Sequence, residues 1–120
     1  SVLFWEHVRR ANLAAGAVDP AAGFGPVNSF GGRMGVTSAT TGVGGQALGG
    51  LSGTYMVCSG AIPGKFAKQL DIQMDDGNTS TGSMRAVADG AAMGAAAISN
   101  TVAPPAGIDD ASNYTVCMTF

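Results

Sequence analysis

Residues 58–85 constrain the fold of this chain more than any other stretch. A strand-like segment ending in Cys58 is followed by a helix-like segment, an acidic turn that contains glycine, and a second strand-like segment. A second cysteine, Cys117, lies near the C-terminus in a segment that alternates as a strand does. This order predicts a small domain of helices and strands that a covalent link can hold together.

The two cysteines are predicted to form a disulfide. No cluster of cysteine and histidine has the spacing of metal ligands, and both Cys58 and Cys117 sit in strand-like segments. Such a bond implies an oxidising compartment. By closing a long loop it would stabilise the fold by about 4 kcal/mol in the chain-entropy model. The alternative is a pair of buried free thiols.

The composition points to a surface with few charges. Only 12% of the 120 residues are charged, against a usual share of about 25%, and 19 are glycine. The surface must therefore consist largely of small and uncharged polar residues. Removing such a surface from water costs little, which favours permanent contacts with copies or partners. A loop-rich extracellular domain would have the same composition.

Several functions are disfavoured by the sequence. The net charge is −2 and the six basic residues are scattered, so no nucleic-acid partner is predicted. The given sequence contains no apolar run of about 18 residues and no secretion signal. His7 is the only histidine, without a sequence reason to meet a nucleophile or an acid, and no phosphate-binding glycine motif is present. No enzyme activity and no catalytic residue are predicted.

Residues 1–15 are predicted to form an amphipathic helix that stops at Gly16. Trp5 borders its apolar stripe. The helix begins abruptly in an apolar run, as the cut end of a longer helix would, although a short native helix is the alternative. The stripe residues recur at three- and four-residue spacing: Phe4, Val8, Ala11 and Ala15.

The remaining chain is predicted to alternate strands, loops and one more helix. Met34 and Val36 would share one face of the first strand, and residues 91–99 could be either a short helix or a loop. The predicted elements are a strand within 31–38, a glycine-rich surface loop at 38–50, a strand at 53–58, a helix at 62–74, and strands at 83–88 and 113–120.

The second helix and the last strand each show a large apolar face. In the helix, Pro63 would occupy the first turn, and Lys65, Lys68 and Asp71 would project away from the apolar stripe. The helical stripe is Ile62, Phe66, Leu70 and Met74, with Ala67 beside them, and the strand face is Tyr114, Val116, Met118 and Phe120.

The end of the second helix carries a possible ion site. Asp71, Asp75, Asp76 and Asn78 cluster there, and carboxylate and amide oxygens are the ligands that Ca²⁺ prefers. The spacing is not that of an EF-hand. Two alternatives remain open: a turn in which an Asp or Asn side chain bonds the backbone as the chain leaves the helix, and an ion pair between Arg85 and Asp75 or Asp76.

Three segments together resemble the type IV pilin-like family, which includes the pseudopilins of type II secretion. They are LFWEHVRRANLAAG, CSGAIPGKFAKQLDIQMDDGNTSTGSMRA and the final NYTVCMTF. The resemblance covers residues 1–16 and 53–88 and, more weakly, the last eight residues.

This resemblance implies a pilin-like α+β fold for the single domain 1–120, in which an N-terminal helix packs on an antiparallel sheet of about four strands with a second short helix. Residues 1–16 would be the C-terminal half of a long helix, and residues 17–120 the head. Phe4, Trp5 and Val8 would seat the helix against the sheet, and the Cys58–Cys117 bond would clamp the last strand.

The same resemblance implies a structural role. The chain would be a pilin or pseudopilin that polymerises with other subunits into a filament, at the cell surface or in the periplasm. A preceding apolar helix of about 25 residues, absent from the sequence given, would anchor it in the inner membrane before assembly. The alternatives are a secreted adhesion or binding module that uses the loop at 37–50, and a domain stabilised by Ca²⁺ at the acidic turn.

Overall fold

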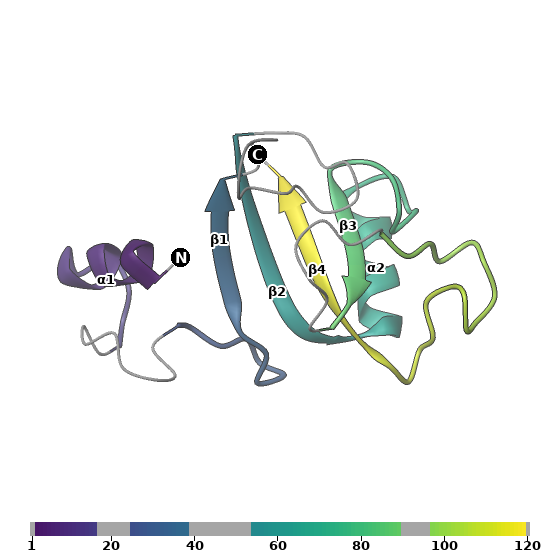
Figure 1. The fold of residues 1–120 in the computed structure, drawn as a ribbon, viewed down its shortest axis with the longest axis horizontal. Helices are drawn as coiled ribbons and strands as arrows, with labels where there is room; N and C mark the ends of the chain where they lie inside the picture. Colours follow the sequence, from purple (N-terminus) through teal and green to yellow (C-terminus); the bar gives the residue numbers. More distant parts are fainter. Residues whose placement is uncertain (1, 17–24, 39–53, 90–96, 120) are drawn as a thin grey trace.

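The computed structural model describes residues 2–16, 25–38, 54–89 and 97–119 (Figure 1). It contains two helices and four strands, which confirms the α+β class and the four-stranded antiparallel sheet. The elements are α1 (Val2–Arg10), β1 (Met34–Ser38), β2 (Tyr55–Pro63), α2 (Gly64–Met74), β3 (Met84–Ala88) and β4 (Asn113–Thr119).

The sheet has the order β1-β2-β4-β3, so the last strand of the chain lies in the middle. Every neighbouring pair is antiparallel, and Cys58 lies directly opposite Cys117 in the β2–β4 pair. β2 is longer than the predicted strand at 53–58 because its pairing with β4 continues through Pro63. The register shifts between Ser59 and Ile62, where Ala61 takes a positive φ of 54°.

β4 is largely buried on both of its faces. Tyr114 and Val116 face the core under α2, as their alternation predicts. Cys117 is fully buried and Thr119 nearly so, although both lie on the opposite face. The alternation of large and small residues along the sequence does not reveal that both faces of this strand are covered. Phe120 lies outside the described residues.

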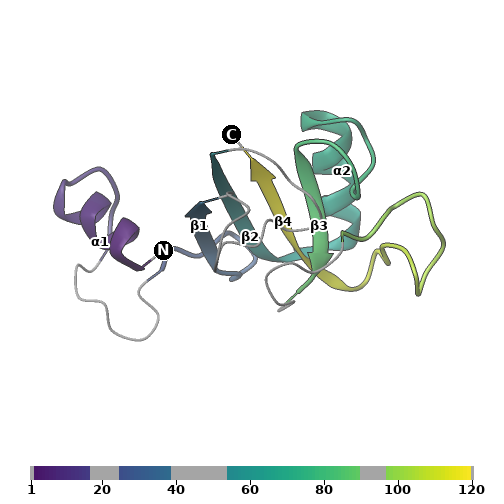
Figure 2. The same ribbon diagram turned by 45° about the horizontal axis from the view of Figure 1, so that its top comes forward.

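α2 covers one face of the sheet, and the loop of residues 97–112 closes the core beside it (Figures 1 and 2). Of the segment 91–99, for which helix and loop were both open, residues 97–99 are not helical and the rest lies outside the described residues. The buried core cluster consists of Ile62, Ala67, Met84, Ala86, Ile108, Tyr114 and Val116.

The core-facing side of α2 matches the predicted apolar stripe only in part: Ile62, just before the helix, is buried in the core, and Leu70 packs against it. The buried residues of α2 are Gly64, Ala67 and Asp71, whereas Phe66 and Met74 are exposed. Small residues let the helix approach the sheet closely, which the larger side chains would prevent. The ring of Phe66 packs instead on Phe30, with 5.3 Å between centroids.

The start of α2 also differs from the prediction. Pro63 precedes the helix as its N-cap residue, with a ψ of 141°, rather than lying in its first turn. It is held in the sheet by pairing with Asn113, and the N–H of Gly64 donates to the carbonyl of Ser112. Strand pairing therefore delays the start of the helix.

Gly64→Ala is expected to destabilise the fold by about 1–3 kcal/mol. A Cβ at this position would collide with the carbonyl oxygen of Asp109 and the side chain of Ile108. Gly25→Ala is the matched control, because its Cβ would meet only the Met34 carbonyl oxygen, at 3.8 Å. Urea denaturation of both variants measures the difference, and an equal effect at the two positions would contradict the close approach at α2.

α1 does not lie across the sheet, and this corrects the predicted packing of Phe4, Trp5 and Val8. The helix sits beyond the β1 edge in both views (Figures 1 and 2), and none of its residues 3–10 is among the buried core residues. Phe4 is 44% exposed and meets Trp5 edge-on, with 4.9 Å between centroids. Instead, α2 covers this face of the sheet. It follows β2 directly in the chain, so the end of β2 places it against the sheet.

α1 is also shorter than the predicted helix at 1–15. It ends at Arg10, and Asn12 adopts a left-handed conformation with a φ of 60°. The N–H of Leu13 then donates to the carbonyl of Val8, as in a helix C-cap. Glu6 and Arg10 form an ion pair of 2.8 Å one turn apart on the helix surface.

Candidate functional site

The predicted disulfide is present. Cys58 of β2 and Cys117 of β4 lie directly opposite each other, with 4.1 Å between their Cα atoms, and their sulfur atoms are bonded. Neither thiol is therefore free, which rules out the alternative of two unbonded cysteines. The bond joins two adjacent strands that are far apart in the sequence, so it fixes the last strand into the middle of the sheet.

The acidic turn after α2 is built by side chains that bond the backbone. The N–H of Asn78 donates to Asp76 Oδ1 at 3.0 Å, and the N–H of Ser80 donates to Asn78 Oδ1 at 3.1 Å. The predicted side-chain turn is therefore confirmed. The hydroxyls of Ser80 and Ser99 also donate to Asn78 Oδ1. This oxygen is already well supplied with donors, so Asn78 is a poor ligand for an ion.

Two of the three aspartates are fixed by hydrogen bonds. Asp75 Oδ2 accepts from the N–H of Met84 at 2.8 Å, which ties the end of α2 to the start of β3. Asp76 Oδ2 accepts from the hydroxyl of Thr81 at 2.5 Å. The Asp75 carboxylate lies against Gly82, whose φ of +72° and missing side chain make room for it. These contacts fix both carboxylates in the turn that follows α2.

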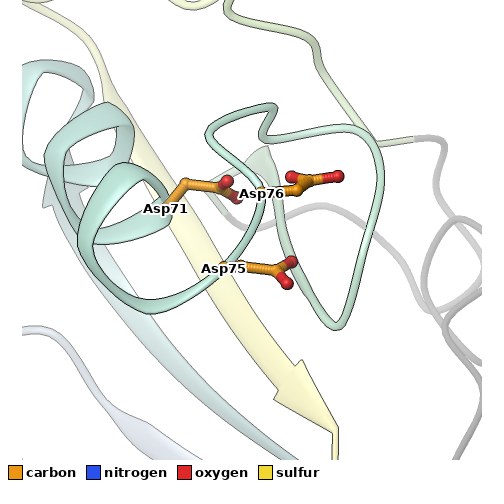
Figure 3. A group of neighbouring side chains, drawn as sticks. All are labelled: Asp71, Asp75 and Asp76. Atoms are coloured by element: carbon orange, nitrogen blue, oxygen red, sulfur yellow. The ribbon is translucent and has the colours of Figure 1, made fainter.

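Asp71 is the third member of the group and lies in the last turns of α2. It was predicted to project away from the helix's apolar face, but it is only 1% exposed and is on the face that α2 turns to the core. Figure 3 shows its side chain directed toward Asp76. One carboxylate oxygen from each of Asp71, Asp75 and Asp76 lies within 4.8 Å of the others.

The environment of Asp71 raises its pKa from 3.8 to about 6. Burial away from water is the main cause, and the negative charge of Asp76 adds to it. The backbone N–H of Gly77 lies near the carboxylate and lowers its pKa, although the geometry falls short of a hydrogen bond. The pKa of Asp76 is lowered, first by the hydrogen bond from Thr81 and then by that from the N–H of Asn78.

The alternative of an ion pair with Arg85 is not realised. The Arg85 guanidinium donates to the carbonyl of Gly82, and within the described ranges no ion pair joins it to Asp75 or Asp76. Met84 and Ala86 belong to the core under α2, so Arg85 between them faces the other side of the sheet. The alternation of β3 thus keeps this charge away from Asp71.

Exposed apolar side chains gather on both helices. Leu3 is 68% exposed on α1, and Ile72 is 65% exposed on α2. An open groove of about 290 Å³ runs along α2, lined by Phe30, Ile62, Phe66, Gln69, Leu70 and Gln73. His7 is exposed on α1. Among the helices in the described segments, none has the length and apolar character needed to span a bilayer.

Sequence reasoning missed two buried residues that lie outside the predicted helices and strands. Thr79 is 1% exposed, and its hydroxyl donates to the carbonyl of Ile98 at 2.6 Å. Ile108 fills the core from the 97–112 loop. Neither residue lies in a segment with the apolar periodicity of a helix or strand, so that periodicity could not have identified them. Most of the glycine-rich loop at 37–50, considered as a recognition surface, lies outside the described residues.

Comparisons with known proteins returned no match: no family model, no curated protein and no solved structure resembles the chain closely enough to count. Fold and site therefore define its class only as a disulfide-bonded α+β domain with a four-stranded antiparallel sheet and an acidic turn at a helix end.

Proposed function

We propose that the chain is the head domain of a filament subunit of the type IV pilin or type II secretion pseudopilin class. Its partners are other copies or related subunits. A preceding apolar helix anchors it in the inner membrane before assembly, and the finished filament lies at the cell surface or in the periplasm. The proposal rests on the resemblance of three sequence segments and on the exposed apolar face of α1.

The exposure of α1 is the observation that carries this proposal. Leu3 and Phe4 are 68% and 44% exposed on a helix whose residues 3–10 contribute nothing to the core cluster. Burying each such side chain against a neighbouring helix would contribute about 1.5–3 kcal/mol. In a filament, helices of successive subunits offer that neighbour, so an otherwise uncovered apolar face becomes an assembly surface.

The head suits repeated lateral contacts for a second reason. With 12% charged residues, it has few ions that must lose their hydration when two heads meet. Contacts related by a screw operation generate an open helical polymer. Each contact can be weak, because many of them act together along a fibre. The disulfide keeps the head folded outside the reducing cytoplasm.

Phe4→Glu in the full-length protein is expected to abolish filaments without unfolding the head. An unpaired carboxylate buried in a helix contact costs more than the roughly 1.4 kcal/mol that corresponds to a tenfold loss in association. Filaments on cells of the native host, counted by electron microscopy after labelling with an antibody to the head, provide the measurement.

Val102→Glu is the matched control for this experiment. Val102 is 49% exposed in the 97–112 loop. This loop extends on the side of the sheet away from α1 (Figure 1). This variant should assemble as the parent does. Filaments that form at normal number with Phe4→Glu, or that persist unlabelled after deletion of the gene, would contradict the proposal.

A further inference from the structure

The three aspartates after α2 come from three places that the fold brings together. Asp71 belongs to the last turns of α2, Asp75 caps the helix, and Asp76 begins the loop toward β3 (Figure 3). Their carboxylate oxygens lie within 4.8 Å of one another. Acidic groups on a surface often cluster without consequence, so proximity alone does not make this a site.

The burial of Asp71 supplies a second and independent observation. Its side chain is 99% removed from solvent, and neither carboxylate oxygen has a hydrogen-bond partner within the described part of the chain. The side chain points at Asp76, into the space that the loop encloses. Buried polar groups in native proteins almost always have partners. A carboxylate left without one at this position calls for a positively charged partner from solution.

The protein itself supplies no such partner in the segments that the structure describes. Arg85 faces the other side of the sheet, and Lys68 is bonded to Asp110 at 2.7 Å. α2 has no basic residue in its last turn. The C-terminal end of a helix also carries partial negative charge, which adds to that of the aspartates.

We propose that Asp71, Asp75 and Asp76 bind a divalent cation, Ca²⁺ in preference to Mg²⁺, and that the ion fastens the loop between α2 and β3. The three side chains offer only oxygen, which suits hard cations. Ca²⁺ accepts oxygen ligands in flexible geometry, whereas Mg²⁺ demands a near-ideal octahedron and gives up its waters reluctantly, so a site with three side-chain ligands favours Ca²⁺.

The ion would act on stability and loop order rather than on catalysis. It would neutralise the buried charge of Asp71 and hold Asp75 and Asp76 together across the helix end. The hydrogen bonds from Met84, Asn78 and Thr81 already orient these two carboxylates, so binding requires little rearrangement. This inference is independent of the filament proposal, because it concerns a different face of the chain and a soluble ion.

Calcium titration of the metal-stripped 120-residue chain tests the proposal. With CaCl2 alone as the probe, calorimetry should show one site per chain with a Kd of about 10⁻⁴ M, typical of extracellular Ca²⁺ modules. At about 10 mM CaCl2 the Tm should rise by roughly 7–14 °C. MgCl2 should bind more weakly. Absence of saturable heat and of any Tm shift, or tighter binding of MgCl2, would overturn the proposal.

Asp71→Asn should weaken CaCl2 binding by at least about tenfold, because it removes one charged ligand. Asp110→Asn makes the same chemical change at an exposed position and should bind as the parent does. In the parent, backbone amide NMR shifts caused by CaCl2 should be largest in residues 71–84. This readout needs no variant, so the proposal also fails if the shifts lie elsewhere or if Asp71→Asn binds with unchanged affinity.

Discussion

Replacing Cys58 and Cys117 together by alanine is expected to lower the free energy of unfolding by about 4 kcal/mol under oxidising conditions. The bond links positions 59 residues apart, so its removal gives the unfolded chain many more conformations. For a domain of this size the loss corresponds to a fall in Tm of roughly 10–20 °C. Thermal and urea denaturation of parent and variant, without reductant, measure the effect.

The reduced parent separates the covalent link from the packing of the side chains. Cys117 is fully buried, so the alanine variant also loses core contacts. The reduced parent should therefore fall between the oxidised parent and the variant, and reductant should leave the variant unchanged. Identical unfolding midpoints for the oxidised and reduced parent would show that the bond does not stabilise the fold.

Asp71→Asn is expected to stabilise the cation-free protein at neutral pH by up to about 3 kcal/mol. The pKa of Asp71 is about 6 in the folded chain and 3.8 without the surrounding structure. Between these values the folded state holds a proton that the unfolded state has released. The parent therefore loses stability as pH rises from about 4 to above 6. The variant carries no charge at this position and avoids that loss.

Urea denaturation at pH 4.5 and 7.5, in buffers stripped of divalent cations, measures this prediction. The gain from Asp71→Asn should be large at pH 7.5 and small at pH 4.5, where the parent's carboxyl is mostly protonated in the fold. Asp110→Asn should leave the parent's pH dependence in place, since Asp110 is an exposed partner of Lys68. A variant equally or less stable than the parent at pH 7.5 would mean that the Asp71 carboxylate has a compensating partner.

Local sequence patterns were enough to predict most of the strands. The alternation in residues 83–88 and 113–120 and the punctuation by glycine around them identify β3 and β4, and the position of each cysteine in a strand made the disulfide a reasonable prediction. The turn at Asp76 and Asn78 was also predictable, because its hydrogen bonds join residues only two positions apart. Hydrogen bonds between residues this close in the chain can be inferred from the sequence alone.

The candidate site was only partly predictable for the same reason. Sequence placed Asp71, Asp75 and Asp76 near one another, since one turn of helix separates them. It did not predict that Asp71 is buried without a partner, because burial depends on which side of α2 meets the sheet. It also included Asn78, whose oxygen receives its donors partly from Ser99, a residue in a distant loop.

What the sequence determined by itself is the set of local elements: two helices, the strands, the acidic turn and the pair of cysteines. The tertiary structure decided which face of α2 is buried, where α1 lies, and that the last strand sits at the centre of the sheet. Hydrophobic periodicity shows that a helix has an apolar side, but several orientations of the helix on the sheet would bury a similar apolar area. Only the fit of small residues such as Ala67 against the sheet selects one of them, and that selection is what buries Asp71.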